Sequence, residues 1–322
     1  MSTRILLGTL IIAAILVLVG LDAGIARHAP LAGGLWMRGS LIPAVVAMLS
    51  GLGSLELAAL LQRRGHAPYA TWATICCLAL VITPWFGPTG MLGASMLQTG
   101  HALFVVLAIA MIGTGIVAVA KRDVEDGLTN MAGTWLIVGY AGLLPSFLTI
   151  LRCDLPGADG AWIVLMVVLL CKVCDIGAYF VGSAIGRTKL IPKVSPNKSV
   201  EGLFGGIAAS CAVALLFWWL HHRAQSAPGA SAEEVSTVGA FLTGVPATIG
   251  RLTVAQTVVF AALIAIVGQC GDLVESVFKR SAGAKDSAVL LPGFGGILDM
   301  IDSPLLAAPV AWFLLSVAWP AV

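Results

Sequence analysis

The chain has 322 residues, of which 59% are hydrophobic and only 11% are charged, and its formal net charge is +2. Its mean hydropathy of +0.99 lies far above that of ordinary soluble domains. This composition excludes a soluble globular protein and indicates an integral membrane protein.

Apolar stretches close to the ~20 residues that cross a bilayer recur along the chain. Because they lack the period-two alternation of a membrane β-barrel, they predict helices. We therefore expect an all-α, polytopic integral membrane protein with about nine transmembrane helices, of which the third and ninth have the least certain bounds. The predicted spans are 5–21, 41–61, 71–86, 102–120, 131–151, 162–183, 203–220, 254–271 and 304–319.

Lysine and arginine residues gather at one end of these spans. Twelve of the 18 flank the N-terminus or the loops after the second, fourth, sixth and eighth helices, while five flank the other loops and Lys172 lies inside a helix. By the positive-inside rule the richer side faces the cytoplasm. We expect residues 1–151 to form N-terminal helices and residues 152–322 to form a C-terminal region with cytoplasmic loops at 184–202 and 272–303.

Three ionisable side chains fall within the apolar spans. Lys172 and Asp175 are about one helical turn apart in the sixth span, and Glu56 lies in the second. Charged groups inside a membrane are costly unless they form pairs or serve a function. The sequence leaves open whether Glu56 pairs with Lys172 or faces an internal cavity.

A first polar segment begins within the sixth span and runs from Asp175 to Gly202. It contains four cations and two carboxylates. An anchor loop that attracts anionic lipid headgroups would account for its cations. The ionisable residues at its start favour a further, functional role.

The densest polar segment runs from Ser276 to Ser303. Asp272, Glu275 and Lys279 precede or begin it at spacings that place them on one helical face, and Asp299 and Asp302 repeat the i, i+3 spacing. A simple connecting loop would explain the cations but explains the paired carboxylates less well. Carboxylate oxygens suit hard divalent cations, and lysine and arginine suit phosphate, so the segment predicts a metal and phosphate site.

The same segment resembles the C-terminal signature of the phosphatidate cytidylyltransferases, S-x-x-K-R-x4-K-D-x5-P-G-H-G-G-x-x-D-R-x-D. Phe294 and Met300 depart from it, because they stand where the signature has His and Arg. The positions in register are Ser276, Lys279, Arg280, Lys285, Asp286, Pro292, Gly293, Gly295, Gly296, Asp299 and Asp302.

A second element of that family, S-P-K-K-T-x-E-G, resembles residues 195–202. Asn197 and Ser199 depart from it. The resemblance covers most of the chain from about residue 175 to 303, while the N-terminal helices match only as apolar spans. The matching positions are Ser195, Pro196, Lys198, Glu201 and Gly202.

The resemblance implies a membrane enzyme of phospholipid biosynthesis whose C-terminal region is catalytic. It would transfer CMP from CTP to phosphatidate, giving CDP-diacylglycerol and pyrophosphate, with Mg²⁺ as its cofactor. The expected partners are CTP, phosphatidate and the lipid bilayer of a cell's inner membrane, without nucleic acid. A homodimer is compatible with this expectation.

The resemblance also implies roles for individual residues. Asp272 and Asp299 would be metal ligands, with Asp302 either as a third ligand or as a hydrogen-bonding partner of the ligands. Glu275 would orient Lys279, and Asp175 would contact substrate. The cations expected to bind the triphosphate or the lipid phosphate are Lys198, Lys279, Arg280 and Lys285, and the residues expected to orient them or the nucleotide are Asp286 and Ser195.

Other functions remain open on the sequence. Another CTP-dependent lipid enzyme, such as a polyprenol or phytol kinase or an archaeal ether-lipid cytidylyltransferase, would need a similar metal and phosphate site. A transporter would use Glu56, Lys172 and Asp175 as an ion path, but it predicts internal repeats that the chain does not show. The departures at Phe294 and Met300 would suit an inactive scaffold.

Phe294 generates a direct prediction. We expect Phe294→His to change the rate of CMP transfer little, because the phosphate of phosphatidate is largely ionised near neutral pH and needs no general base. The measurement is the turnover of the two proteins under identical conditions. A large gain in rate would instead show that the histidine of the signature handles a proton.

Overall fold

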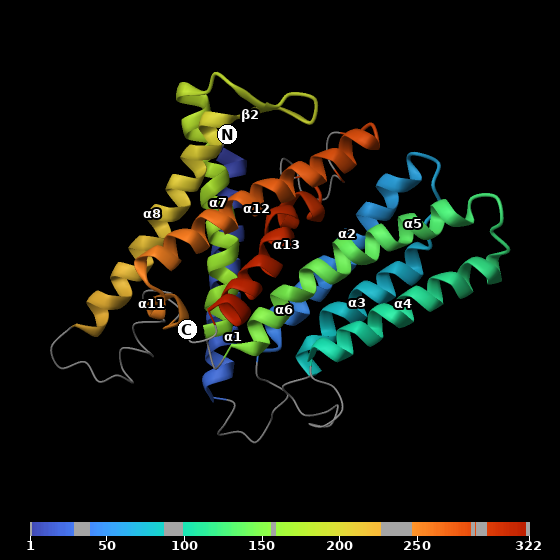
Figure 1. The fold of residues 1–322 in the computed structure, drawn as a ribbon, viewed down its shortest axis with the longest axis horizontal. Helices are drawn as coiled ribbons and strands as arrows, with labels where there is room; N and C mark the ends of the chain where they lie inside the picture. Colours follow the sequence, from blue (N-terminus) through green and yellow to red (C-terminus); the bar gives the residue numbers. More distant parts are fainter. Residues whose placement is uncertain are drawn as a thin grey trace.

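The computed structural model describes residues 2–28, 39–86, 99–155, 159–226, 247–284, 287 and 295–319. Within these ranges the chain is almost entirely helical, and long helices run alongside one another (Figure 1). The long helical segments are α1 (Ser2–His28), α2 (Leu41–Gln62), α3 (Ala70–Phe86), α4 (Thr99–Lys121), the continuous α5 (Gly127–Ile137), η3 (Val138–Leu143) and α6 (Leu144–Asp154), α7 (Asp159–Ile185), α8 (Val200–Gln225), α12 (Val254–Ser281), and α13 (Ile297–Phe313) with η5 (Leu314–Ala318).

Two small elements complete the described fold. A short helix, α11 (Ala247–Arg251), precedes α12. A hairpin of β1 (Lys189–Ile191) and β2 (Ser195–Ser199) connects α7 to α8, and its strands pair antiparallel. The hairpin occupies the segment that the sequence analysis treated as a polar loop.

The prediction of an all-α, multi-pass membrane protein is confirmed. Seven of the helical segments are long and apolar enough to cross a bilayer, and two shorter apolar helices, Ala13–Ala26 and Ala70–Phe86, bring the described total to the nine expected. The bounds of the last two spans differ from those predicted. α12 extends to Ser281 and α13 begins at Ile297, so the polar residues around them belong to helices that pack together.

The connections that the cation count assigned to one side lie at one end of the helices. The start of α1, the hairpin and the C-terminal end of α12 all occupy the upper part of Figure 1, whereas α8 ends at the lower left. Arg280 at the end of α12 donates from Nε to the carbonyl oxygen of Val194 in the hairpin, at 3.5 Å. The Arg64 side chain after α2 contacts the carbonyl oxygen of Ser281.

Glycines allow α7 and α8 to approach closely. A Cβ added at Gly206 would lie 2.5 Å from the carbonyl oxygen of Cys174, and one at Gly177 would lie 2.8 Å from the Cβ of Ala209. Gly182 and Gly186, spaced four residues apart on α7, both border the Ser199 hydroxyl. The start of α8 is therefore held against α7 where the hairpin joins them.

Two clusters of buried apolar side chains meet along α13. Ala307 and Ala308 pack in a cluster that draws most on α7 and also includes residues of α1, α2 and α12, whereas Leu298 and Leu305 pack with α2, α3 and η3. The N-terminal and C-terminal helices thus share α13 as a common surface. Because α13 packs on both sides, polar side chains in its first turns, such as Asp302, are buried.

The α7–α8 contact can be tested by Gly206→Ala. The added methyl group would overlap backbone of α7, so we expect this variant to lose roughly 1–3 kcal/mol of stability. Thermal unfolding in detergent measures the loss. Gly115→Ala in α4 is the matched control, because a Cβ there meets nothing within 4 Å, and it should unfold no earlier than the parent. Equal behaviour of the two variants would contradict the close contact.

Candidate active site

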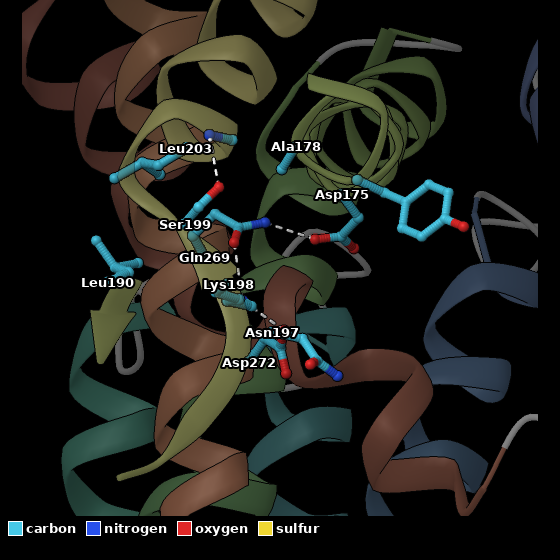
Figure 2. A pocket seen from close by; sticks show the side chains of 11 residues that line it. Asp175, Ala178, Leu190, Asn197, Lys198, Ser199, Leu203, Gln269 and Asp272 are labelled. Atoms are coloured by element: carbon cyan, nitrogen blue, oxygen red, sulfur yellow. Dashed lines mark hydrogen bonds and ion pairs between the residues drawn. The ribbon is translucent and has the colours of Figure 1, made fainter. Parts of the chain in front are cut away.

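A cleft of about 220 Å³ opens between α7, the β2 strand, the start of α8, and α12. Figure 2 shows polar side chains from three of these elements converging in it. The residues that line it are Asp175, Ala178, Tyr179, Leu190, Asn197, Lys198, Ser199, Gly202, Leu203, Gln269 and Asp272.

A chain of polar contacts crosses this cleft. The Nζ of Lys198 lies 2.5 Å from Oδ2 of Asp272 and donates to Oε1 of Gln269 at 2.8 Å. The Nε2 of Gln269 donates to Oδ1 of Asp175 at 2.6 Å, and Lys172 lies 3.5 Å from the other oxygen of Asp175. The hairpin lysine is therefore tied to α12 and, through Gln269, to α7.

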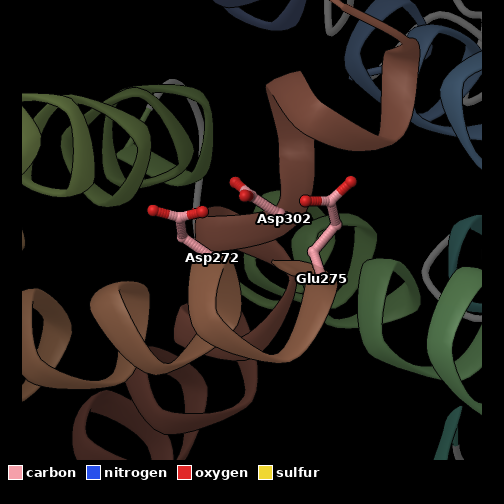
Figure 3. Close-up of side chains that lie close together, drawn as sticks. All are labelled: Asp272, Glu275 and Asp302. Carbon is pink, nitrogen blue, oxygen red and sulfur yellow. The ribbon is translucent and has the colours of Figure 1, made fainter. Parts of the chain in front are cut away.

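Three carboxylates gather at the α12 side of the cleft. Asp272 and Glu275 on α12 and Asp302 on α13 each place one oxygen within 4.8 Å of the others (Figure 3). Glu275 is fully buried and Asp302 is 4% exposed. The close approach of the two helices at Gly271, where an added Cβ would overlap the Asp302 backbone, brings these side chains together.

The donor set of this carboxylate cluster fits a hard divalent cation. Three like charges in a medium of low dielectric repel one another strongly, and a cation with oxygen ligands removes that repulsion. In the described part of the chain, Oε1 of buried Glu275 has no hydrogen-bond partner, which leaves an oxygen available as a ligand. Asp272, Glu275 and Asp302 are the residues that would hold Mg²⁺.

Lys279 lies beside the cluster between two carboxylates. Its Nζ contacts Glu275 one turn earlier on α12 and lies 2.5 Å from Oδ1 of Asp299 on α13. Asp299 also accepts hydrogen bonds at Oδ2 from the backbone N–H of Gly296 at 2.8 Å and from that of Ser287 at 3.1 Å. The Asp299 carboxylate thus binds the ammonium group of Lys279 and the backbone at the start of α13.

Comparison with known proteins identifies the family. A family model described as "Cytidylyltransferase family" matches residues 24–318. This chain belongs to the cytidylyltransferase family. A protein of Pseudomonas aeruginosa named phosphatidate cytidylyltransferase is 33% identical over 293 residues, which cover 88% of this chain and 92% of that protein.

Other relatives match this chain over a shorter length. A phosphatidate cytidylyltransferase of Brucella suis is 40% identical over 173 residues, covering 54% of this chain and 53% of the relative. An Escherichia coli protein whose name says only that it is uncharacterized is 37% identical over 156 residues, which cover 48% of this chain and 43% of the Escherichia coli protein.

The structure brings together most of the described residues that the sequence assigned to the site. Asp175, Lys198 and Asp272 line the cleft, and Asp302 joins the carboxylate cluster. Glu275 contacts Lys279 as expected and also belongs to the cluster.

Three further described residues lie outside the cleft and the carboxylate cluster. Asp299 lies outside the three-carboxylate cluster, so its direct coordination of metal stays a prediction. Ser195 in β2 and Arg280 do not line the described cleft, although Arg280 bonds the same hairpin. Lys285 and Asp286, like Phe294, fall outside the described residues.

Sequence reasoning missed Gln269 and left the partner of Glu56 open. Gln269 lies three residues before Asp272, and a lone amide on the face of an apolar helix was the available signal. Glu56 neither pairs with Lys172 nor lines the described cleft: it binds the start of α13, a contact between residues more than 240 positions apart that no local pattern reports.

The carboxylate cluster generates a metal-binding prediction. We expect Asp302→Asn to weaken Mn²⁺ binding, measured by titration in detergent, by about tenfold or more, because the cluster loses an anionic oxygen ligand. Asp299→Asn tests whether Asp299 coordinates the metal directly. An equal loss of Mn²⁺ affinity would support direct coordination, whereas retained affinity would show that Asp299 serves only as the partner of Lys279. Unchanged binding by Asp302→Asn would contradict the cluster as a metal site.

Proposed function

We propose that this protein transfers CMP from CTP to phosphatidate, giving CDP-diacylglycerol and pyrophosphate. The observation that carries the proposal is the carboxylate cluster of Asp272, Glu275 and Asp302 beside a cleft that contains Lys198. Membership of the cytidylyltransferase family and the name of the Pseudomonas relative support the choice of CTP and phosphatidate.

The reaction requires positioning more than covalent chemistry. An oxygen of the lipid phosphomonoester forms a bond to the α-phosphorus of CTP, while the bond from that phosphorus to the oxygen bridging to the β-phosphate breaks. Pyrophosphate leaves with the electron pair. Phosphoryl-type transfers of this kind depend on holding the reactants in line and neutralising charge, so no nucleophilic side chain is needed.

The roles of the residues follow from their places. Mg²⁺ at Asp272, Glu275 and Asp302 would supply neutralisation of charge on phosphate oxygens. Lys198 reaches the same place from the hairpin, where its ammonium can bind phosphate in exchange for Asp272. Lys279, held by Glu275 and Asp299, supplies a second positive charge at the cluster.

The site also suits a substrate that stays in the membrane. The cleft is bordered by β2. This strand lies at the helix ends that the positive-inside rule assigns to the cytoplasm, where CTP is dissolved (Figure 1). Tyr179, which borders the cleft on α7, and Phe180 and Phe204 near it have largely exposed apolar side chains. We propose that the protein lies in the inner membrane with this end cytoplasmic, so that phosphatidate keeps its acyl chains in the bilayer.

The test is incubation of the protein in lipid micelles with radiolabelled CTP, phosphatidate and Mg²⁺, following label into the organic phase. We expect phosphatidate-dependent labelling, and we expect Asp272→Asn to lower it to about a hundredth or less, since removing a metal ligand costs several kcal/mol of transition-state stabilisation. Asp154→Asn is the matched control, because Asp154 is exposed at the far end of the helices and binds Trp312.

Two results would contradict the proposal. One is labelling that does not require phosphatidate, which would direct attention to another lipid acceptor. The other is an unchanged rate in the folded Asp272→Asn protein, which would remove that carboxylate from the reaction.

A further inference from the structure

Glu56 binds the first turn of a helix far away in the sequence. It lies in α2 and is 7% exposed. Its Oε1 accepts a hydrogen bond from the backbone N–H of Ile297 at 2.9 Å, and its Oε2 accepts one from Leu298 at 2.9 Å. These are the first two residues of α13, whose N–H groups have no partner within the helix and favour a negative charge.

The Glu56 carboxylate lies close to the backbone before α13. A Cβ added at Gly296 would lie 2.5 Å from Oε2 of Glu56 and 2.2 Å from the hydroxyl of Ser287, so a larger residue there would displace these side chains. About one turn before Glu56, a Cβ at Gly53 would be in ordinary van der Waals contact with the side chains of Leu298 and Ile301, so α2 and α13 lie against each other there. The start of α13 is therefore fitted closely to α2.

A hydrogen-bonded path runs from Glu56 to the carboxylate cluster. The hydroxyl of Ser287 lies 3.0 Å from Oε2 of Glu56 and 2.9 Å from Oδ2 of Asp299, and its single proton is shared between these two acceptors. The other oxygen of Asp299 binds Lys279, and Lys279 contacts Glu275.

We infer that Glu56 is a positioning residue for the metal site. By fixing the start of α13, it sets where Asp302 lies roughly one and a half turns later. Through Ser287 and Asp299 it also sets the place of Lys279 beside Glu275. The consequence for the reaction rests on the proposed function, but the consequence for metal binding does not.

Glu56→Gln tests the inference with little change of shape. The amide nitrogen of glutamine faces one of the two backbone N–H groups and cannot accept its hydrogen bond, so the start of α13 loses both a partner and a charge. Ser287→Ala is the second variant: it breaks the path to Asp299 and leaves both backbone hydrogen bonds of Glu56 in place.

Asp22→Asn is the matched control. Asp22 in α1 accepts hydrogen bonds from the backbone N–H groups of Leu41 and Ile42 at the start of α2, at 3.0 and 3.3 Å, and also pairs with Arg152. It therefore binds a helix start as Glu56 does, but away from the carboxylate cluster. Its loss should lower the thermal stability without changing the metal site.

Each protein is titrated with Mn²⁺ in detergent, and the apparent Mg²⁺ constant and kcat of CMP transfer are then measured. We expect Glu56→Gln to weaken Mn²⁺ binding and raise the apparent Mg²⁺ constant by about tenfold, the size seen when a group supporting a metal ligand is removed. Ser287→Ala should shift both constants in the same direction by a smaller factor, and Asp22→Asn should leave them within about twofold of the parent.

The inference is overturned if the folded Glu56→Gln protein binds Mn²⁺ as the parent does, or if Asp22→Asn weakens binding equally. If the proposed function is wrong, the unmutated protein itself will transfer no CMP, which is a different result from unchanged Mn²⁺ binding in the variant. In that case the Mn²⁺ titration alone still decides the role of Glu56.

Discussion

The close contact between α12 and α13 is the constraint on which the site depends. At Gly271 the two helices approach so closely that a methyl group would overlap the backbone at Asp302. This contact brings two carboxylates of α12 and one of α13 within 4.8 Å of one another, with two of them buried. Such an arrangement is costly without positive charge nearby. Lys198 and Lys279 supply part of that charge, and the donor set fits a divalent cation for the rest.

Two carboxylates bind the backbone at the start of α13, one from another helix and one from α13 itself. Glu56 of α2 binds its first two backbone N–H groups, and Asp299 in its own first turn binds the N–H of Gly296. At the opposite end of the helices, Asp22 of α1 binds the start of α2 in the same manner. Helix starts carry unpaired donors and partial positive charge, so an acidic side chain from a neighbouring helix can both satisfy and locate them. In a chain with few charged residues, several carboxylates serve this purpose.

The hairpin brings the remaining positive charge to the site. Its lysine reaches Asp272 and Gln269 on α12, while Arg280 at the end of α12 bonds the hairpin backbone. The hairpin and α12 therefore hold each other through polar contacts. Such contacts can exchange for phosphate oxygens more readily than apolar packing can, because an ammonium bound to a carboxylate binds a phosphate by the same interaction.

The sequence by itself determined the membrane class, the approximate places of the nine apolar helices in the described part of the chain, and the two polar segments. Spans are readable because lipid demands about 20 apolar residues in a row, and that requirement is local. The spacing of Asp272, Glu275 and Lys279 on one helical face was readable for the same reason, since it follows from helix geometry alone. Only the tertiary structure decided which carboxylates meet. It grouped Asp302 with Glu275 and placed Asp299 on Lys279, because the rotation of α13 against α12 depends on packing across the whole bundle. Glu56 shows the limit most clearly, since its partners lie more than 240 residues away and no spacing along the chain encodes that distance.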